Sequence, residues 1–136
     1  MAGVVFVDSS GWIALLSARD GRHTDAERTV RELVRTRARL ITTNLILAEV
    51  HRWLLFRAGP LAARTALDRL ERSPSLELVF ATPEHHTVAH ASLERFADQR
   101  WSYTDAVSFA VMRARRCETA LTFDRDFVVA GFRQVP

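Results

Sequence analysis

The chain has 136 residues, 48% hydrophobic and 26% charged, which is the size and balance of one globular domain. All 19 of its Lys and Arg residues are arginine, which excludes the lysine of a phosphate-binding P-loop, a Schiff base or a phosphoacceptor receiver domain. The single Cys117 cannot form an internal disulfide, and neither a signal peptide nor an apolar run of ~18 residues is evident, so we expect a cytoplasmic protein without a membrane span.

The first quarter of the chain predicts a strand followed by two helices. Residues 3–7 form a short apolar run, typical of a buried parallel strand, and Asp8 follows its carboxyl end. The serines at residues 9–10 can cap the first helix, which ends at the turn signal of residues 20–21. The capping box Thr-Asp-Ala-Glu then predicts a second helix over residues 24–37.

The middle of the chain repeats this alternation. Residues 38–42 predict a second strand, and a Thr-Asn pair opens a helix over residues 43–58 that stops at Gly-Pro. An amphipathic helix follows over residues 61–72, and residues 76–81 predict the third strand. The next helix begins with Pro83 at its first helical position.

The stretch from residue 102 to residue 127 predicts a helix and a returning strand of equal length. Ser102 can cap a helix over residues 105–116, and residues 119–123 predict a buried strand. The helix covers roughly 18 Å and the strand about 17 Å, so the chain leaves an edge of the sheet and returns to it. Asp105 and Asp124 should therefore lie at the same edge, where open α/β folds build their sites.

The order of elements, ending in an edge strand at residues 132–135, predicts an α/β fold in which helical layers enclose a mostly parallel sheet. Linkers, internal repeats and low-complexity tracts are absent from the sequence, so residues 1–136 are expected to form one domain. The first strand is not followed by G-x-G-x-x-G, so a nucleotide cofactor is unsupported.

Acidic residues from distant parts of the sequence converge on that predicted edge. Asp8, Asp105 and Asp124 reach it from strand ends and a helix start. Glu49 leans toward it from the second turn of its helix, and Asp126 follows closely behind. Taken singly, Asp8 could be a helix cap, Glu49 a surface acid and Asp126 a turn residue. Together they cannot all remain ionised unless a cation joins them.

Oxygen ligands without histidine or cysteine favour Mg²⁺ or Mn²⁺, and such a site without a nucleotide loop fits hydrolysis of a phosphodiester. The expected metal ligands are Asp8, Asp105 and Asp124. Glu49 is either a fourth ligand or the general base that orients the attacking water. Asp126 is a secondary candidate for the metal, and Thr104 and Ser9 are expected to support the site through hydrogen bonds.

Four segments carry a resemblance to a known family. They are Val-Asp-Ser-Ser at 7–10, Leu-Ala-Glu-Val at 47–50, Tyr-Thr-Asp-Ala-Val-Ser-Phe at 103–109 and Leu-Thr-Phe-Asp-Arg-Asp-Phe at 121–127. In this order and spacing they resemble the acidic motifs of PIN-domain ribonucleases, in particular the VapC toxins of bacterial VapBC toxin–antitoxin pairs. The likeness extends over essentially the whole chain.

The resemblance implies a Mg²⁺- or Mn²⁺-dependent endoribonuclease that cuts RNA such as tRNA, rRNA or mRNA and thereby inhibits translation. It also implies a PIN domain with sheet order 3-2-1-4-5, a homodimer, and inhibition by a VapB antitoxin within a larger complex. It places metal ligation most firmly on Asp8 and Asp105, with Asp124 and Glu49 completing the site.

Two other functions are alternatives to an RNA-cleaving enzyme. A haloacid-dehalogenase-like phosphatase would use Asp8 as a covalent nucleophile, but it needs an aspartate at position 10, where the chain has Ser10, and a later lysine. The alternative is a PIN-fold module that binds RNA or protein without cutting it. Clustered negative charge facing phosphates argues against a pure binder.

Basic and aromatic residues supply candidate contacts to RNA and partners. With a net charge of only +3, local arginines must attract the RNA, and the candidates near the acidic edge are Arg19, Arg22, Arg100, Arg113, Arg116 and Arg125. Trp12, Trp53 and Trp101 could stack on bases, but Trp12 and Trp53 lie on the apolar faces of their helices and are expected to pack in the core or an interface. A groove between the helices of Trp12 and Trp53 is the predicted antitoxin site. The spacing of His86 and His90 gives weak support for zinc, and a solvated helix face is preferred.

Overall fold

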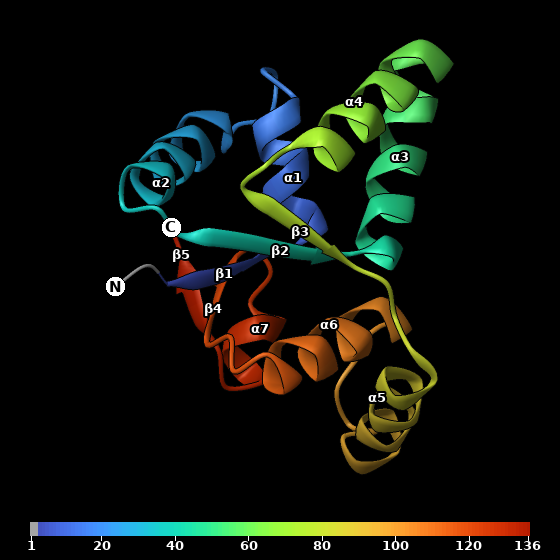
Figure 1. Ribbon diagram of the computed structural model, residues 1–136. Helices are drawn as coiled ribbons and strands as arrows, with labels where there is room; N and C mark the ends of the chain where they lie inside the picture. The colour runs from blue at the N-terminus through green and yellow to red at the C-terminus, as the bar shows by residue number, and fades with distance from the viewer. Residues whose placement is uncertain (1–2) are drawn as a thin grey trace.

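The computed structural model describes residues 3–136 and shows a five-stranded sheet enclosed by helices on both faces (Figure 1). The strands are β1 (Val4–Val7), β2 (Arg39–Thr43), β3 (Leu76–Val79), β4 (Thr119–Leu121) and β5 (Arg133–Val135). The helices are α1 (Ser9–Leu16), α2 (His23–Arg35), α3 (Asn44–Ala58), α4 (Pro60–Arg72), α5 (Pro83–Arg95), α6 (Tyr103–Ala114) and α7 (Asp126–Val129).

The sheet has the order β3-β2-β1-β4-β5, and every pairing is parallel. This confirms the predicted α/β class and sheet order. Helices α1 to α4 lie on one face and α5, α6 and α7 on the other (Figure 1). Phe6, Ile41 and Leu121 on the central strands are almost completely buried, because a parallel sheet is covered on both faces. Within the described residues, the helices are too short or too polar to cross a bilayer.

Most predicted boundaries agree with the structure, including three helix caps. The hydroxyls of Thr43, Thr82 and Ser102 each accept a hydrogen bond from a backbone N–H in the first turn of the following helix. Strands β3 and β4 are shorter than predicted and end at Val79 and Leu121. The neighbouring strands end at the same level, so the ladders stop there, although the N–H of Thr122 still donates to the carbonyl of Val135 at 3.1 Å.

The predicted start of α2 is wrong. The helix begins at His23 without a side-chain cap, so Thr24 lies inside the first turn instead of capping it. The reason is the preceding turn, in which the side chain of Asp20 accepts from the N–H of Arg22 at 2.8 Å and its carbonyl accepts from His23 at 3.0 Å. The His23 ring also lies 2.7 Å from the carbonyl oxygen of Ala14. These bonds start the helix earlier than the capping-box pattern indicated.

Gly11 lets the start of α1 lie directly against the carboxyl end of β4. A Cβ atom at this position would lie 2.6 Å from the carbonyl oxygen of Leu121 and would also clash with its side chain. The same contact includes a 3.1 Å hydrogen bond from the Asp8 N–H to the Leu121 carbonyl. The close approach therefore brings the residue after β1 beside the loop that follows β4.

We expect Gly11→Ala to lower the free energy of unfolding by about 1–3 kcal/mol, because the added methyl group meets backbone that cannot move aside. This loss outweighs a gain of about 1 kcal/mol in helix propensity. Urea denaturation followed by circular dichroism measures the change. Gly21→Ala is the matched control, since its Cβ would meet no atom within 4 Å. Equal stabilities of the two variants would contradict the close approach.

Candidate metal centre

The acidic residues meet at the carboxyl edge of the sheet. Asp8 follows β1, Asp124 and Asp126 follow β4, and Asp105 lies in the first turn of α6. Glu49 faces the same edge from the second turn of α3. Parallel strands and the helices that follow them bring these ends together, as the lengths of the elements predicted.

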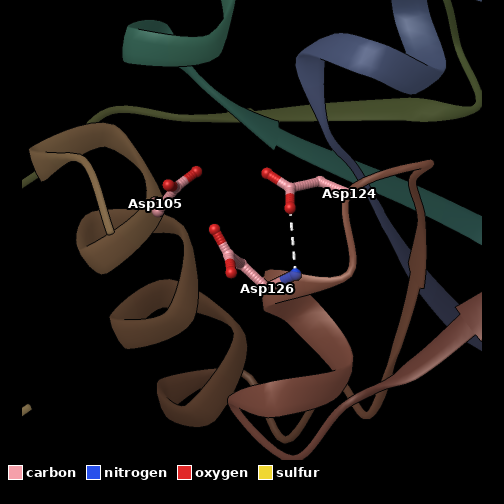
Figure 2. Close-up of side chains that lie close together, drawn as sticks. All are labelled: Asp105, Asp124 and Asp126. Carbon is pink, nitrogen blue, oxygen red and sulfur yellow. Dashed lines mark hydrogen bonds between the residues drawn. The ribbon is translucent and has the colours of Figure 1, made fainter. Parts of the chain in front are cut away.

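Three of the acids form the tightest group. Asp105, Asp124 and Asp126 each offer one carboxylate oxygen, and these oxygens lie within 4.8 Å of one another (Figure 2). Asp124 is oriented by accepting a 2.9 Å hydrogen bond from the N–H of Asp126. Asp105 is oriented by the capping box, in which its carboxylate accepts from the N–H of Ser102 at 3.0 Å. The backbone therefore fixes two of the three carboxylates.

Asp8 is the most buried acid of the site, with 4% of its surface exposed. It occupies the N-cap position of α1, but its side chain makes no capping hydrogen bond. Instead, its Oδ2 atom accepts hydrogen bonds from the hydroxyls of Thr122 at 3.0 Å and Ser10 at 3.1 Å. The carboxylate is thus held by the site and not by the helix.

Glu49 lies at the exposed rim, where the hydroxyls of Ser9 and Thr104 favour its charged form. Partial burial nevertheless raises the pKa of its carboxyl, and the charges of Asp8 and Asp105 raise it further. Glu49 is therefore coupled to the other acids although it lies on a different layer of helices. The supporting positions predicted for Ser9 and Thr104 agree with this arrangement.

The other acids show the same electrostatic pattern. Burial is the largest cause that raises the pKa of Asp8, Asp105 and Asp126, and the charge of a neighbouring acid adds to it in each case. Asp105 raises the pKa of Asp8, and Asp124 raises the pKa values of Asp105 and Asp126. A divalent cation would remove this repulsion. The donor set, made only of carboxylate oxygens, fits a hard ion such as Mg²⁺ or Mn²⁺.

The structure brings together every acid predicted for the site, but the acids that lie closest together differ from the expected metal ligands. Asp126, a secondary candidate in the sequence, belongs to the tightest group with Asp105 and Asp124. Asp8 and Glu49 lie outside that group yet interact with it electrostatically. The roles of these residues as metal ligands stay predictions.

Two hydroxyl residues of the site were missed. Ser10 was interpreted as a helix cap, but its hydroxyl donates to Asp8, accepts from the N–H of Phe123 at 2.9 Å and lies 3.3 Å from the hydroxyl of Thr122. Thr122 donates to Asp8 and accepts from the N–H of Asp124 at 3.0 Å. The signal in the sequence was a hydroxyl two residues from each acid, in Asp-x-Ser and Thr-x-Asp.

The arginines predicted near the acids divide into two sets. The guanidinium carbon of Arg22 lies 4.9 Å from the ring centre of Phe123, and Arg125 stands exposed between the acids that follow β4. The placement of Arg113 and Arg116 at the acidic edge is wrong. Helix α6 begins at the acids and ends at the opposite edge of the sheet, where both arginines line a cavity.

The predicted groove between α1 and α3 exists, but Trp12 does not line it. Trp12 is buried, and its indole N–H donates to the hydroxyl of Thr42 at 3.2 Å. Trp101 is also buried, whereas Trp53 is half-buried. Trp12 therefore packs in the core as expected, and an interface role for Trp53 stays a prediction. The groove, of about 330 Å³, is lined instead by Ile13 and Trp53 with neighbouring residues of both helices.

The histidines of α5 have other partners. His85 completes the capping box of its own helix, and His86 lies 2.9 Å from the hydroxyl of Tyr103. His90 lies 3.9 Å from Glu94 on the surface. His86 and His90 are both exposed, as expected for a solvated helix face.

Comparison with known proteins identifies the family. The model of the family described as PIN domain matches residues 5–133, so the chain belongs to the PIN-domain family. The 23S rRNA-specific endonuclease VapC20 of Mycobacterium tuberculosis is 35% identical over 132 residues, which cover 97% of this chain and 98% of that protein. The resemblance to PIN-domain VapC proteins is therefore confirmed.

Solved structures show the same relationship. The crystal structure of M. tuberculosis VapC20, described as a sarcin-ricin loop cleaving toxin, aligns with a TM-score of 0.86 and 34% identity over 94% of this chain and 95% of that one. The structure of VapBC2 from Rickettsia felis, bound to promoter DNA, aligns with a TM-score of 0.72 and 12% identity and covers 96% of both chains. FitAcB from Neisseria gonorrhoeae aligns with a TM-score of 0.73 and 13% identity over 97% of this chain and 96% of that one. At these identities, the last two structures show a shared fold alone.

We expect metal-free Asp105→Asn to be at least as stable as the wild type at neutral pH. The raised pKa of Asp105 means that ionisation costs the folded state stability as pH rises from the ordinary value of 3.8 through the folded pKa. Below 3.8 the acid is protonated in both states and the advantage of the variant disappears. The amide can still accept the capping hydrogen bond.

Urea denaturation in EDTA, at neutral pH and at about pH 4, measures this difference. Asp68→Asn, which changes an exposed acid on α4, is the control and should show no such trend with pH. If Asp105→Asn unfolds more easily than the wild type at neutral pH, the main role of Asp105 is to cap α6.

Proposed function

We propose that this chain is a single PIN domain over residues 1–136 that hydrolyses RNA with the help of Mg²⁺ or Mn²⁺. The main support is the convergence of carboxylates from separate segments in one site, where burial and mutual repulsion raise the pKa of Asp8 and Asp105. The relative that shares 35% identity over 97% of the chain is a 23S rRNA-specific endonuclease. A structured ribosomal RNA is accordingly the proposed substrate, and inhibition of translation is the proposed consequence.

The acids have different roles in the proposed reaction. Asp105, Asp124 and Asp126 would hold the ion, together with Asp8. When bound, the ion would polarise the scissile phosphate and lower the pKa of a bound water. Glu49 would accept a proton from the attacking water, because its raised pKa brings it closer to the operating pH than an ordinary glutamate.

The hydroxyls missed in the sequence position these carboxylates. Thr122 donates to Asp8 and accepts from the backbone of Asp124, so one side chain connects the residues that follow β1 and β4. Ser10 adds a second bond to Asp8. Both hydroxyls donate to the Oδ2 atom of Asp8, and a backbone hydrogen bond from Ser9 also favours the charged form of this carboxylate. The Oδ1 atom accepts from neither hydroxyl and would be the one to face the ion.

We expect the purified protein to cleave RNA in Mg²⁺ and to leave it intact in EDTA. Asp105→Asn should reduce the cleavage rate at least about a hundredfold, because a ligand to an ion worth several kcal/mol of transition-state stabilisation is lost. Electrophoresis of end-labelled RNA measures both effects. Asp68→Asn, remote on α4, should cleave like the wild type. Intact RNA in both tubes would favour the alternative, a non-catalytic PIN-fold binding module.

The partner is proposed to be a VapB antitoxin that occupies the groove between α1 and α3. The groove combines the apolar side chains of Ile13, Trp53 and Phe56 with Arg52, and its lower end is formed by Glu49 and Ser9. Phe56 is 72% exposed, which is costly for so large an apolar side chain unless a partner covers it. An amphipathic helix bound here would also cover Glu49 and so block the site. The homodimer and the larger complex stay predictions.

We expect Trp53→Ala to weaken antitoxin binding by about tenfold or more, since aromatic anchors dominate such interfaces. Calorimetric titration with a purified candidate VapB protein tests this. Val88→Ala, an exposed apolar residue on α5 in the opposite layer, is the control. Unchanged affinity in a folded Trp53→Ala variant would refute the groove as the antitoxin site. Trp12→Ala is unsuitable because it would disturb the core.

A further inference from the structure

A basic cavity lies at the sheet edge opposite the acids. Its volume is about 450 Å³, and its walls come from the end of α6, the start of β4 and the turn between α7 and β5. The charged residues that line it are Arg113, Arg116, Arg133 and Glu118. The cavity therefore carries more positive than negative charge.

This positive charge is not neutralised within the described chain. Arg113, Arg116 and Arg133 have no carboxylate within ion-pair distance among residues 3–136. By contrast, Arg39 and Arg115 at the same edge share Glu77. Unpaired arginines that converge in a cavity are the arrangement that binds phosphate.

One of these arginines is held in position. The guanidinium of Arg113 donates to the carbonyl of Ala130 at 2.9 Å and lies 5.0 Å from the ring centre of Phe132. Arg116 follows α6 in a left-handed backbone with φ of 51°, a geometry that ends a helix and turns the chain toward β4. Both residues line the cavity.

The cavity and the acids are joined by the same two elements. Helix α6 carries Asp105 in its first turn and ends at Ala114 beside the cavity, about 14 Å farther along at 1.5 Å per residue. Figure 2 shows α7 also leading away from the acids, and the bond from Arg113 to Ala130 joins the far ends of the two helices. An RNA strand must therefore extend well beyond the phosphate at the acids to reach the cavity.

We infer that this cavity binds a second backbone phosphate of the RNA, away from the phosphate at the acidic centre. The inference rests on the proposed RNA-cleaving function and adds a second point of attachment to it. The acids at the cleavage site repel RNA, and a distant basic site would recover affinity and set the direction of the strand. An RNA too short to reach the cavity would gain nothing from it.

The test is the double variant Arg116→Gln with Arg133→Gln, which removes two charges without touching the acids. For a hairpin RNA of about 20 nucleotides, we expect KM in Mg²⁺ to rise about tenfold with kcat unchanged. Binding of the same RNA in EDTA should weaken about tenfold, and the slope of log K against log salt should fall by about 1.5. A trinucleotide substrate should show no change. Arg64→Gln with Arg69→Gln, two exposed arginines on α4, is the charge-matched control.

These measurements distinguish failure of the phosphate-binding inference from failure of the proposed function. A wild type that cleaves RNA, combined with variants that behave like the control, overturns the inference but leaves the proposed function intact. A wild type that never cleaves RNA overturns the proposed function, while a loss of hairpin binding in the variant still supports a basic RNA site. If only the binding of inorganic phosphate or a mononucleotide is lost and hairpin binding is unchanged, the cavity serves small anions and its assignment to RNA is overturned.

Discussion

Mutual repulsion among carboxylates is the constraint on which the rest of the structure depends. Five acids share the carboxyl edge of the sheet, and the pKa values of Asp8, Glu49, Asp105 and Asp126 are raised by burial and by one another. The fold tolerates this because backbone N–H groups and buried hydroxyls hold the side chains in place. The site is therefore assembled before an ion enters, and ion binding would relieve a cost that folding has already incurred.

The charge of the molecule is divided between the two edges of the sheet. Acids gather where the strands end, and unpaired arginines line a cavity where β4 and β5 begin. Helix α6 connects them, with Asp105 in its first turn and Arg113 in its last. Each charge also lies at the helix end whose dipole favours it. A net charge of only +3 is thus distributed unevenly, with acids at one edge of the sheet and arginines at the other, which would suit a long anionic polymer bound along one face.

Local patterns predicted most of the fold and the acids of the site, whereas long-range side-chain contacts were not predictable. Apolar runs and capping residues such as Ser102 act within a few neighbours, so strands, helices and the edge shared by Asp105 and Asp124 followed from them. Asp126 and Thr122 were undervalued because their directions depend on packing between β1 and β4. Arg113 and Arg116 were misplaced although the length of α6, which located Asp105 correctly, already assigned them to the opposite edge.

The raised pKa values at the acidic edge would govern how an ion competes for the site. Protons and a divalent ion would occupy the same carboxylate oxygens, so the proposed metal affinity would fall as the medium becomes more acidic. The metal-free fold responds in the opposite sense, since protonation relieves its internal repulsion. Acidity would thus weaken the proposed binding of the ion without adding repulsion to the acidic edge.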